Sequence, residues 1–131
     1  IVITFFDQLY FAPGRADLLK PAKTVLAEVS EVLNKIPNRI AIEGHTDDDK
    51  PIPGSPYPTN WDLAAGRAVS VARFFSEECA VNPGRIQATS YSEFTPLFPN
   101  SIAENRAKNR RVSVVIMRDE LSEPQRPMPE L

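Results

Sequence analysis

The hydrophobic pattern of the chain predicts four strands. Residues 1–6 are a run of β-branched and aromatic side chains, which is typical of a strand. Residues 39–43 form a short run with an apolar centre. Residues 86–91 and 111–117 alternate between apolar and polar positions, as expected for strands with one buried face.

Between the predicted strands, apolar residues recur every three or four positions. This spacing predicts amphipathic helices over residues 17–36 and 60–78. Thr59 or Asn60 offers a side chain that can cap the second of these helices. A third, short helix is predicted over residues 101–108, because Ser101 and Glu104 match a capping box.

The predicted order is therefore strand, helix, strand, helix, strand, short helix, strand. Helices between strands require crossover connections, so we expect an α/β fold with parallel strand pairs and helices covering one side of the sheet. With 131 residues, of which 42% are hydrophobic, the chain has the size of one domain. We assign this domain to residues 1–120 and expect the proline-bearing residues 121–131 to be a disordered tail.

Composition excludes several classes of protein. The net charge of −2 and the pI near 5.4 argue against a nucleic-acid binder. The one cysteine, Cys79, cannot form an internal disulfide or a cysteine-based zinc site, and we expect a buried, inert thiol. No apolar run approaches the length of a bilayer span, and no signal segment is recognised at the start. Because residue 1 is Ile, we expect a fragment or a processed product.

A loop that is rich in aspartate and proline follows the strand at residues 39–43. Three adjacent carboxylates, Asp47 to Asp49, stand where ligands bind in α/β sheets, so the loop is either a site for a hard cation or a solvated acidic turn. His45 could act as a general base, although a structural histidine at a strand end is the simpler interpretation. Four prolines between residues 51 and 58 predict a stiff, exposed loop.

One face of the second predicted helix carries an arginine. Asn60, Leu63 and Arg67 lie three and four positions apart and therefore share this face, which Leu63 directs inward. A buried arginine requires an anion. Its partner is either Asp47, in a structural ion pair, or the carboxylate of a ligand, which a guanidinium binds with two parallel hydrogen bonds.

Four basic side chains lie between residues 106 and 111, and they resemble a phosphate-binding patch. Arg110 and Arg111 open the last predicted strand, where successive side chains point to opposite faces. We therefore expect one of the two to face solvent and the other to face the candidate site. The negative net charge of the chain makes nucleic acid a poor candidate for this patch.

Three segments occur in an order and at separations that resemble the OmpA-like peptidoglycan-binding domain. They are residues 42–47 (IEGHTD), 60–68 (NWDLAAGRA) and 105–112 (NRAKNRRV). The resemblance covers roughly residues 3–118 and implies an α+β sandwich with the order β-α-β-α-β-α-β and a mixed four-stranded sheet. Three positions depart from the family pattern: Ala64 stands where the family usually has serine, Gly66 stands inside a helix where it often has a basic residue or alanine, and Ser92 stands at a turn where it mostly has glycine.

The resemblance implies a binding protein without catalytic activity or a cofactor. It implies that the carboxylate of Asp47 and the guanidinium of Arg67 bind the charged ends of diaminopimelate in the peptide stem of peptidoglycan. The other peptidoglycan-binding positions that the resemblance implies are Thr46, Asn60, Leu63 and Arg110.

Within the family, the chain most resembles the MotB branch, the stator subunits of the flagellar motor. The long proline loop at residues 47–57 and the segments at residues 11–18 and 57–61 favour this branch. It implies a periplasmic domain on an inner-membrane helix, a homodimer and a MotA-like partner subunit. The alternatives are a Pal- or OmpA-type protein linked to the outer membrane, a domain that has kept only protein interactions, and a metal-assisted wall hydrolase that uses His45 and Asp47 to Asp49.

Overall fold

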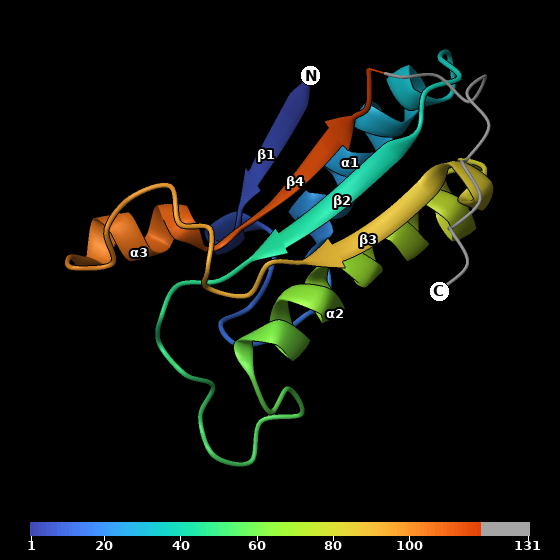
Figure 1. Cartoon of the computed structure of the whole chain (residues 1–131). Coiled ribbons are helices and arrows are strands. Elements are labelled where there is room, and N and C mark those ends of the chain that lie inside the picture. The colour runs from blue at the N-terminus through green and yellow to red at the C-terminus, as the bar shows by residue number, and fades with distance from the viewer. Residues whose placement is uncertain (119–131) are drawn as a thin grey trace, which may run out of the picture.

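The structure is a computed structural model that describes residues 1–118, and its elements follow the predicted order (Figure 1). The strands are β1 (Val2–Phe6), β2 (Ile40–His45), β3 (Ile86–Ser90) and β4 (Arg111–Ile116). The helices are α1 (Lys20–Leu33), α2 (Asn60–Arg73) and α3 (Ala103–Asn109). The predicted tail, residues 121–131, lies outside the described residues.

The four strands form one mixed sheet in the order β1-β4-β2-β3. Strands β2 and β3 are parallel, whereas β4 is antiparallel to both β1 and β2. Helix α2 lies between the two parallel strands in the chain and forms the crossover connection that such a pair requires, as expected. The last strand in the chain, β4, lies between β1 and β2. The first and last strands of the domain are therefore neighbours in the sheet.

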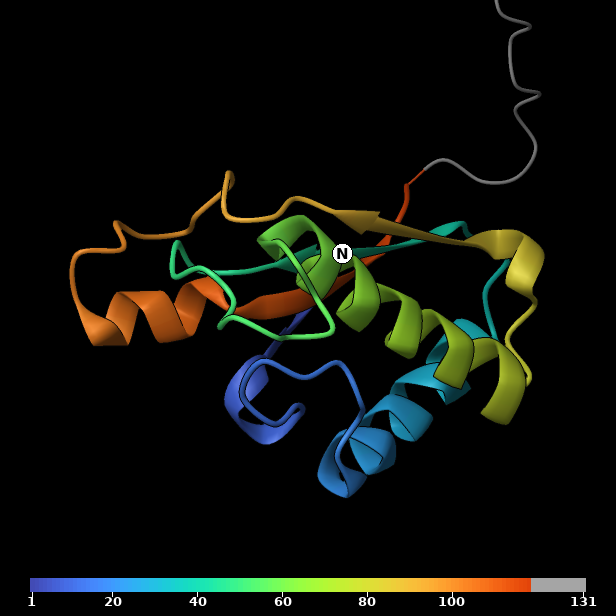
Figure 2. The same ribbon diagram turned by 90° about the horizontal axis from the view of Figure 1, so that it is seen from below.

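The two long helices cover one face of this sheet, as Figure 2 shows from below. Leu26 and Leu33 of α1 and Val71 of α2 are buried against Ile42 of β2 and Val114 of β4. These side chains belong to the predicted apolar stripes, and their burial confirms the predicted fold class. The short helix α3 lies beyond the end of the sheet and does not cover this face (Figure 1).

Helix α1 begins three residues later than its apolar pattern predicts. Leu18 forms a β-bridge with Phe11, and the N–H of Leu19 donates to the carbonyl of Tyr10 at 3.0 Å. Contacts with the preceding loop therefore hold residues 17–19 extended, and Lys20 is the first helical residue. Pro21 occupies the first turn, where its missing N–H costs no helical hydrogen bond.

The capping box is found at α2 rather than at α3. The Thr59 side chain accepts a hydrogen bond from the N–H of Asp62, and the Asp62 carboxylate accepts one from the N–H of Thr59 at 3.0 Å. At α3 the cap is Ile102, without a side-chain hydrogen bond, so the box predicted at Ser101 is wrong. The cap of the helix is one residue later than predicted, at Ile102 instead of Ser101. The side chains of Ser101 and Glu104 are therefore not in the positions that a capping box requires.

One smaller expectation is corrected, and one departure from the family pattern is accommodated. Cys79 is half-buried at the edge of the core, after a π-helical turn (Phe74–Glu78), rather than fully buried. Ser92 does adopt the left-handed conformation, with φ of 53°, that its turn requires.

Within residues 1–118, no helix combines the length and the apolar character needed to cross a membrane.

Candidate functional site

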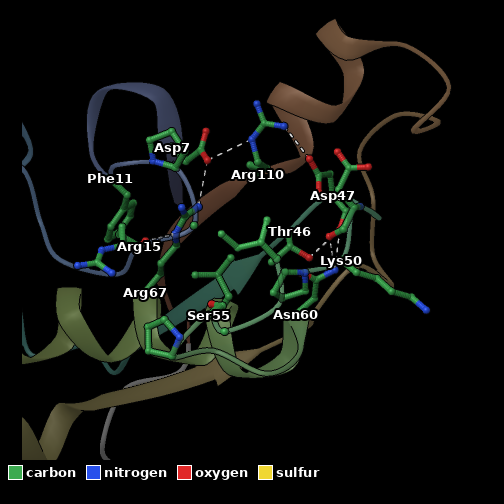
Figure 3. A pocket seen from close by; sticks show the side chains of 18 of the residues that line it. Asp7, Phe11, Arg15, Thr46, Asp47, Lys50, Ser55, Asn60, Arg67 and Arg110 are labelled. Carbon is green, nitrogen blue, oxygen red and sulfur yellow. Dashed lines mark hydrogen bonds and ion pairs between the residues drawn. The ribbon is translucent and has the colours of Figure 1, made fainter.

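A cavity of about 640 Å³ lies where the end of β1, the end of β2 and the start of β4 meet the first turns of α2 (Figure 3). The structure brings together all six residues predicted from the sequence, and each lines this cavity: Thr46, Asp47, Asn60, Leu63, Arg67 and Arg110. Asp47 lies two residues after the end of β2, and Arg110 directly precedes β4, so two adjacent strands place their charges side by side.

The buried partner of Arg67 is Asp7, not Asp47. The Nη1 atom of Arg67 lies 3.1 Å from the Oδ2 atom of Asp7, and both side chains are almost fully buried. One of the two predicted alternatives, a structural ion pair between Asp47 and Arg67, is therefore wrong. Arg67 pairs instead with Asp7, which directly follows β1. Burial lowers the pKa of the Arg67 guanidinium, and the charge of Asp7 opposes this shift.

Arg110 bridges the two aspartates. Its Nε atom donates to the Oδ2 atom of Asp7 at 3.1 Å, and its Nη1 atom donates to the Oδ2 atom of Asp47 at 2.6 Å. Desolvation alone would lower the pKa of Arg110, but the hydrogen bond with Asp47 and the charge of Asp7 outweigh it, so the pKa is raised. Two carboxylates and two guanidiniums thus balance each other along one wall of the cavity (Figure 3).

Arg67 also holds the loop that follows β1 over the cavity. Its Nε atom donates to the carbonyl of Arg15 at 2.8 Å, and its Nη2 atom donates to the carbonyl of Ala12 at 3.4 Å. Its guanidinium carbon lies 4.8 Å from the centre of the Phe11 ring, a cation–π contact. One buried arginine on α2 therefore organises both the charged wall and residues 11–15.

The remaining predicted residues shape the turn after β2. Asn60 donates to the carbonyls of Asp49 and Asp47, at 2.9 and 3.3 Å, and the Thr46 hydroxyl donates to the carbonyl of Asp47 at 2.8 Å. The N–H of Asp49 donates to the Oδ1 atom of Asp47 at 3.0 Å. Leu63 supplies apolar surface to the cavity. These contacts keep the Asp47 carboxylate directed at Arg110.

The proline loop forms a second wall of the cavity. Residues from Lys50 to Pro56 line it, although much of the loop is exposed to solvent as predicted. The ring of Tyr57 packs on Gly66, where an added Cβ would lie 2.8 Å from the Cε1 atom of that ring. The glycine inside α2 therefore gives the tyrosine a place to pack and ties the loop to the helix.

Arg111 and His45 lie outside the cavity. Arg110 points to the site, as one side chain of that pair was expected to, but Arg111 is buried rather than facing solvent. It donates to the carbonyls of Asn109 and Thr95, each at 3.0 Å. His45 stacks on Tyr91 with ring centres 5.0 Å apart, and its Nδ1 atom lies 2.8 Å from the Thr95 hydroxyl. This is the structural histidine of the simpler interpretation.

The environment of His45 makes the stability of the fold depend on pH. Burial, together with the charge of Arg111, lowers the pKa of His45 to about 4. The unfolded chain takes up the proton near pH 6.5, so the stability is fully present above that pH and falls as the pH drops towards 4. We expect the free energy of unfolding to fall by about 2 kcal/mol more between pH 7 and pH 5 in the wild type than in His45→Gln. Urea denaturation at both pH values measures this difference, and equal losses would refute it.

The acidic run does not form a cation site in the described part of the chain. Asp48 and Asp49 are exposed, whereas Asp47 is buried against Arg110. Residues 1–118 hold no group of three or more histidine, cysteine, aspartate or glutamate side chains placed to bind a metal ion. The carboxylate of Asp49 lies instead 3.8 Å from the Nε atom of Arg106.

Sequence reasoning missed Asp7 and the loop at residues 11–15. Asp7 faces the site because β1 pairs with β4: Phe6 lies opposite Arg111, and the N–H of Asp7 donates to the carbonyl of Arg110 at 3.0 Å. An aspartate directly after a predicted strand was a visible signal. Its meaning depended on knowing that the first and last strands are neighbours.

Comparisons with known proteins identify relatives of the chain. Residues 10–110 match the OmpA family. Motility protein B of Bacillus subtilis is 36% identical over 118 residues, which cover 89% of this chain and 45% of that protein. The chain spans about half the length of the curated relatives it matches.

Solved structures share the fold. A putative MotB-like protein from Desulfovibrio vulgaris has a TM-score of 0.84 and 37% identity, covering 90% of this chain and 75% of that one. The cell wall anchor of the T6SS from Pseudomonas aeruginosa has a TM-score of 0.81 and 31% identity, with coverage of 88% and 79%. The periplasmic domain of Helicobacter pylori MotB has a TM-score of 0.77 and 27% identity, with coverage of 86% and 73%.

Proposed function

The chain belongs to the OmpA family, and from this premise we propose that it binds the peptide stems of peptidoglycan without catalysis. The ligand group would be diaminopimelate, which carries an ammonium and a carboxylate on one side chain. The peptidoglycan-binding residues would be Thr46, Asp47, Asn60, Leu63, Arg67 and Arg110, which share the cavity.

Unused hydrogen-bond donors in the cavity carry this proposal. A guanidinium has five N–H donors. Arg67 donates through three of its nitrogen atoms to Asp7, Ala12 and Arg15, and Arg110 donates through two to Asp7 and Asp47. Arg110, whose side chain is 30% open to solvent, therefore keeps N–H groups that can bind a ligand carboxylate, which accepts hydrogen bonds from a planar donor.

The same wall can accept an ammonium group. Each carboxylate oxygen of Asp47 accepts one hydrogen bond from the chain, and a carboxylate has room for about four. Arg110 is the more exposed arginine, with 30% of its side chain open to solvent. A ligand ammonium can compete with it for Asp47 while the ligand carboxylate binds the Arg110 guanidinium. This exchange of ion pairs suits a ligand that carries both charges.

The chemistry of the site supports binding rather than catalysis. The histidine of the hydrolase alternative, His45, lies outside the cavity and is engaged by Thr95 and Tyr91. The carboxylate of Asp47 is held in an ion pair with Arg110. These contacts favour a protein that holds its ligand and releases it unchanged.

At the level of the whole protein, we propose a MotB-like stator subunit that anchors the flagellar motor to the cell wall. The similarity to Motility protein B and to the periplasmic MotB domain supports this assignment. It implies a periplasmic domain, an inner-membrane helix outside this sequence, a homodimer and a MotA-like partner. The structural likeness to a secretion-system wall anchor favours wall anchoring in a different machine as a second candidate. A Pal- or OmpA-type protein linked to the outer membrane is a further alternative.

The first test is binding to purified peptidoglycan. Replacing Asp47 with asparagine removes one charge from the cavity and keeps the size of the side chain. Replacing Arg110 with glutamine also removes one charge and keeps a shorter, polar side chain. A charge-assisted hydrogen bond contributes about 1.5–3 kcal/mol, so we expect each variant to bind peptidoglycan about 10-fold to 100-fold more weakly. Co-sedimentation with purified sacculi, and calorimetry with a soluble muropeptide, measure the change.

Arg73→Gln is the matched control, because Arg73, the last residue of α2, forms an exposed ion pair with Glu77 of the following π-helical turn, and neither residue lines the cavity. It removes the same charge and should bind as the wild type does. Binding that survives in both cavity variants, or that falls equally in Arg73→Gln, would refute the assignment of the site.

A further inference from the structure

Arg110 uses different nitrogen atoms for its two ion pairs. Its Nε atom donates to the carboxylate of Asp7 at 3.1 Å, and its Nη1 atom donates to that of Asp47 at 2.6 Å (Figure 3). The bond to Asp47 can therefore break while the bond to Asp7 remains. Both Nη atoms would then be available, and together they form a planar fork that can bind a carboxylate.

Asp7 is held in place by its backbone and by its side chain. Its N–H donates to the carbonyl of Arg110 at 3.0 Å, and its carbonyl accepts hydrogen bonds from the N–H groups of Tyr10 and Phe11, at 3.0 and 2.9 Å. Its Oδ2 atom also accepts a hydrogen bond from the buried Arg67, at 3.1 Å. The carboxylate is therefore fixed before any ligand arrives, and it can support a second side chain that moves.

The charges around the two aspartates determine which of them a ligand cation can bind. Asp7 lies beside Arg67, which is buried and bonded to the loop after β1, so an ammonium group at Asp7 would meet a fixed positive charge. Within residues 1–118, Asp47 has one ion-pair partner, the partly exposed Arg110. We therefore expect a ligand ammonium to replace Arg110 at Asp47 and to leave the pair between Asp7 and Arg110 intact.

We infer that Asp7 is a positioning residue, which holds Arg110 at its Nε atom while the two Nη atoms pass from Asp47 to a ligand carboxylate. This inference rests on the proposed function, because it requires a ligand that carries both an ammonium and a carboxylate. Asp7 is not among the six proposed binding residues, and it acts through Arg110. The ligand carboxylate then meets a guanidinium that is already oriented, which lowers the entropy lost on binding.

The test compares two soluble ligands. One is the stem tripeptide that ends in diaminopimelate, and the other is the same peptide with the side-chain carboxylate of diaminopimelate converted to an amide. We expect the wild type to prefer the free carboxylate about 10-fold to 100-fold, because the amide forms no charge-assisted hydrogen bond with Arg110. Calorimetry measures both affinities on one protein sample. Their ratio does not depend on the folded fraction, so a variant that is only less stable keeps the preference.

Two variants test the role of Asp7. Asp7→Asn keeps the size of the side chain and removes its charge, so it should lose most of the preference and bind the amidated peptide almost as the wild type does. Arg110→Lys keeps the positive charge but has a single nitrogen atom, which cannot hold Asp7 and also form a fork for the ligand. It should lose most of the preference as well. Asp17→Asn is the matched control and should keep it, because Asp17 is exposed and does not line the cavity.

The double variant Asp7→Asn with Arg110→Gln shows whether Asp7 acts through Arg110. If it does, the preference that remains in Arg110→Gln should not fall further when Asp7 is also replaced. A further fall would show that Asp7 acts by another route and would overturn this inference.

The remaining outcomes separate this inference from the proposed function. If the wild type binds both peptides equally well, or if the preference persists in Asp7→Asn or Arg110→Lys, the inference is wrong while the proposed function stands. An equal loss of affinity for both peptides in Asp7→Asn also overturns it, because a purely structural role has that effect. If the wild type binds neither peptide, the proposed function fails and this inference fails with it.

Discussion

Replacing Asp7 with alanine is expected to lower the free energy of unfolding by about 3–5 kcal/mol, the usual cost of leaving a buried charge without its partner. Asp7 is 5% exposed and Arg67 is 2% exposed, so water cannot take the place of the lost carboxylate. Arg110 loses a partner in the same step, since the Oδ2 atom of Asp7 accepts hydrogen bonds from both arginines. Urea denaturation of the two proteins at pH 7 measures the effect.

Two further variants separate charge burial from a general loss of packing. Glu77→Ala removes the partner of the exposed Arg73 and should cost less than about 1 kcal/mol. The double replacement Asp7→Leu with Arg67→Met removes both buried charges, and we expect it to recover much of the stability that Asp7→Ala loses. A stability of Asp7→Ala within 1 kcal/mol of the wild type would refute the assigned role of this ion pair.

Replacing Gly44 with alanine is expected to destabilise the fold by about 3 kcal/mol, at the upper end of the range for overpacking. Gly44 lies in β2, beneath α2. A Cβ at this position would overlap the carbonyl oxygen of Ala64 and lie 2.8 Å from its carbonyl carbon. Both are backbone atoms of a packed helix, so relief requires moving α2 away from the sheet. The cavity lies at the start of that helix, so ligand binding should weaken together with stability.

Gly84→Ala is the control for this replacement. There the nearest atom to an added Cβ is the Oδ1 atom of Asn82, at 3.3 Å, which belongs to a side chain on an exposed turn. We expect a change below about 1 kcal/mol in that variant. Thermal or urea unfolding of both proteins gives the comparison, and equal losses would show that α2 does not depend on close approach at Gly44.

The elements of the fold follow from local patterns. The three- and four-residue spacing of Leu26, Val29 and Leu33 predicts α1. The alternation of Val112, Val114 and Ile116 predicts β4. Boundaries were less predictable. The start of α1 depends on the bridge between Leu18 and Phe11, and the capping box sits at Thr59 rather than Ser101. These details depend on a few hydrogen bonds that periodicity does not report.

The residues of the candidate site were also predicted in part from local patterns. Asn60, Leu63 and Arg67 could be placed on one face of a helix, because helical geometry relates residues three and four positions apart. The motif after β2 located Asp47, and the motif before β4 located Arg110. All of them do line one cavity. The sequence also required an anion near Arg67, since a buried guanidinium without one is costly.

By itself, then, the sequence determined the order of the elements, the inward face of α2 and the residue types of the site. Only the tertiary structure decided which charges meet. Asp7 and Arg67 are 60 positions apart, and Asp7 and Arg110 are 103 apart. Their contact depends on β4 pairing with both β1 and β2 in one sheet. Local patterns record how each segment folds against its neighbours in the chain, whereas ion pairs across a sheet depend on strand order, which no local pattern records.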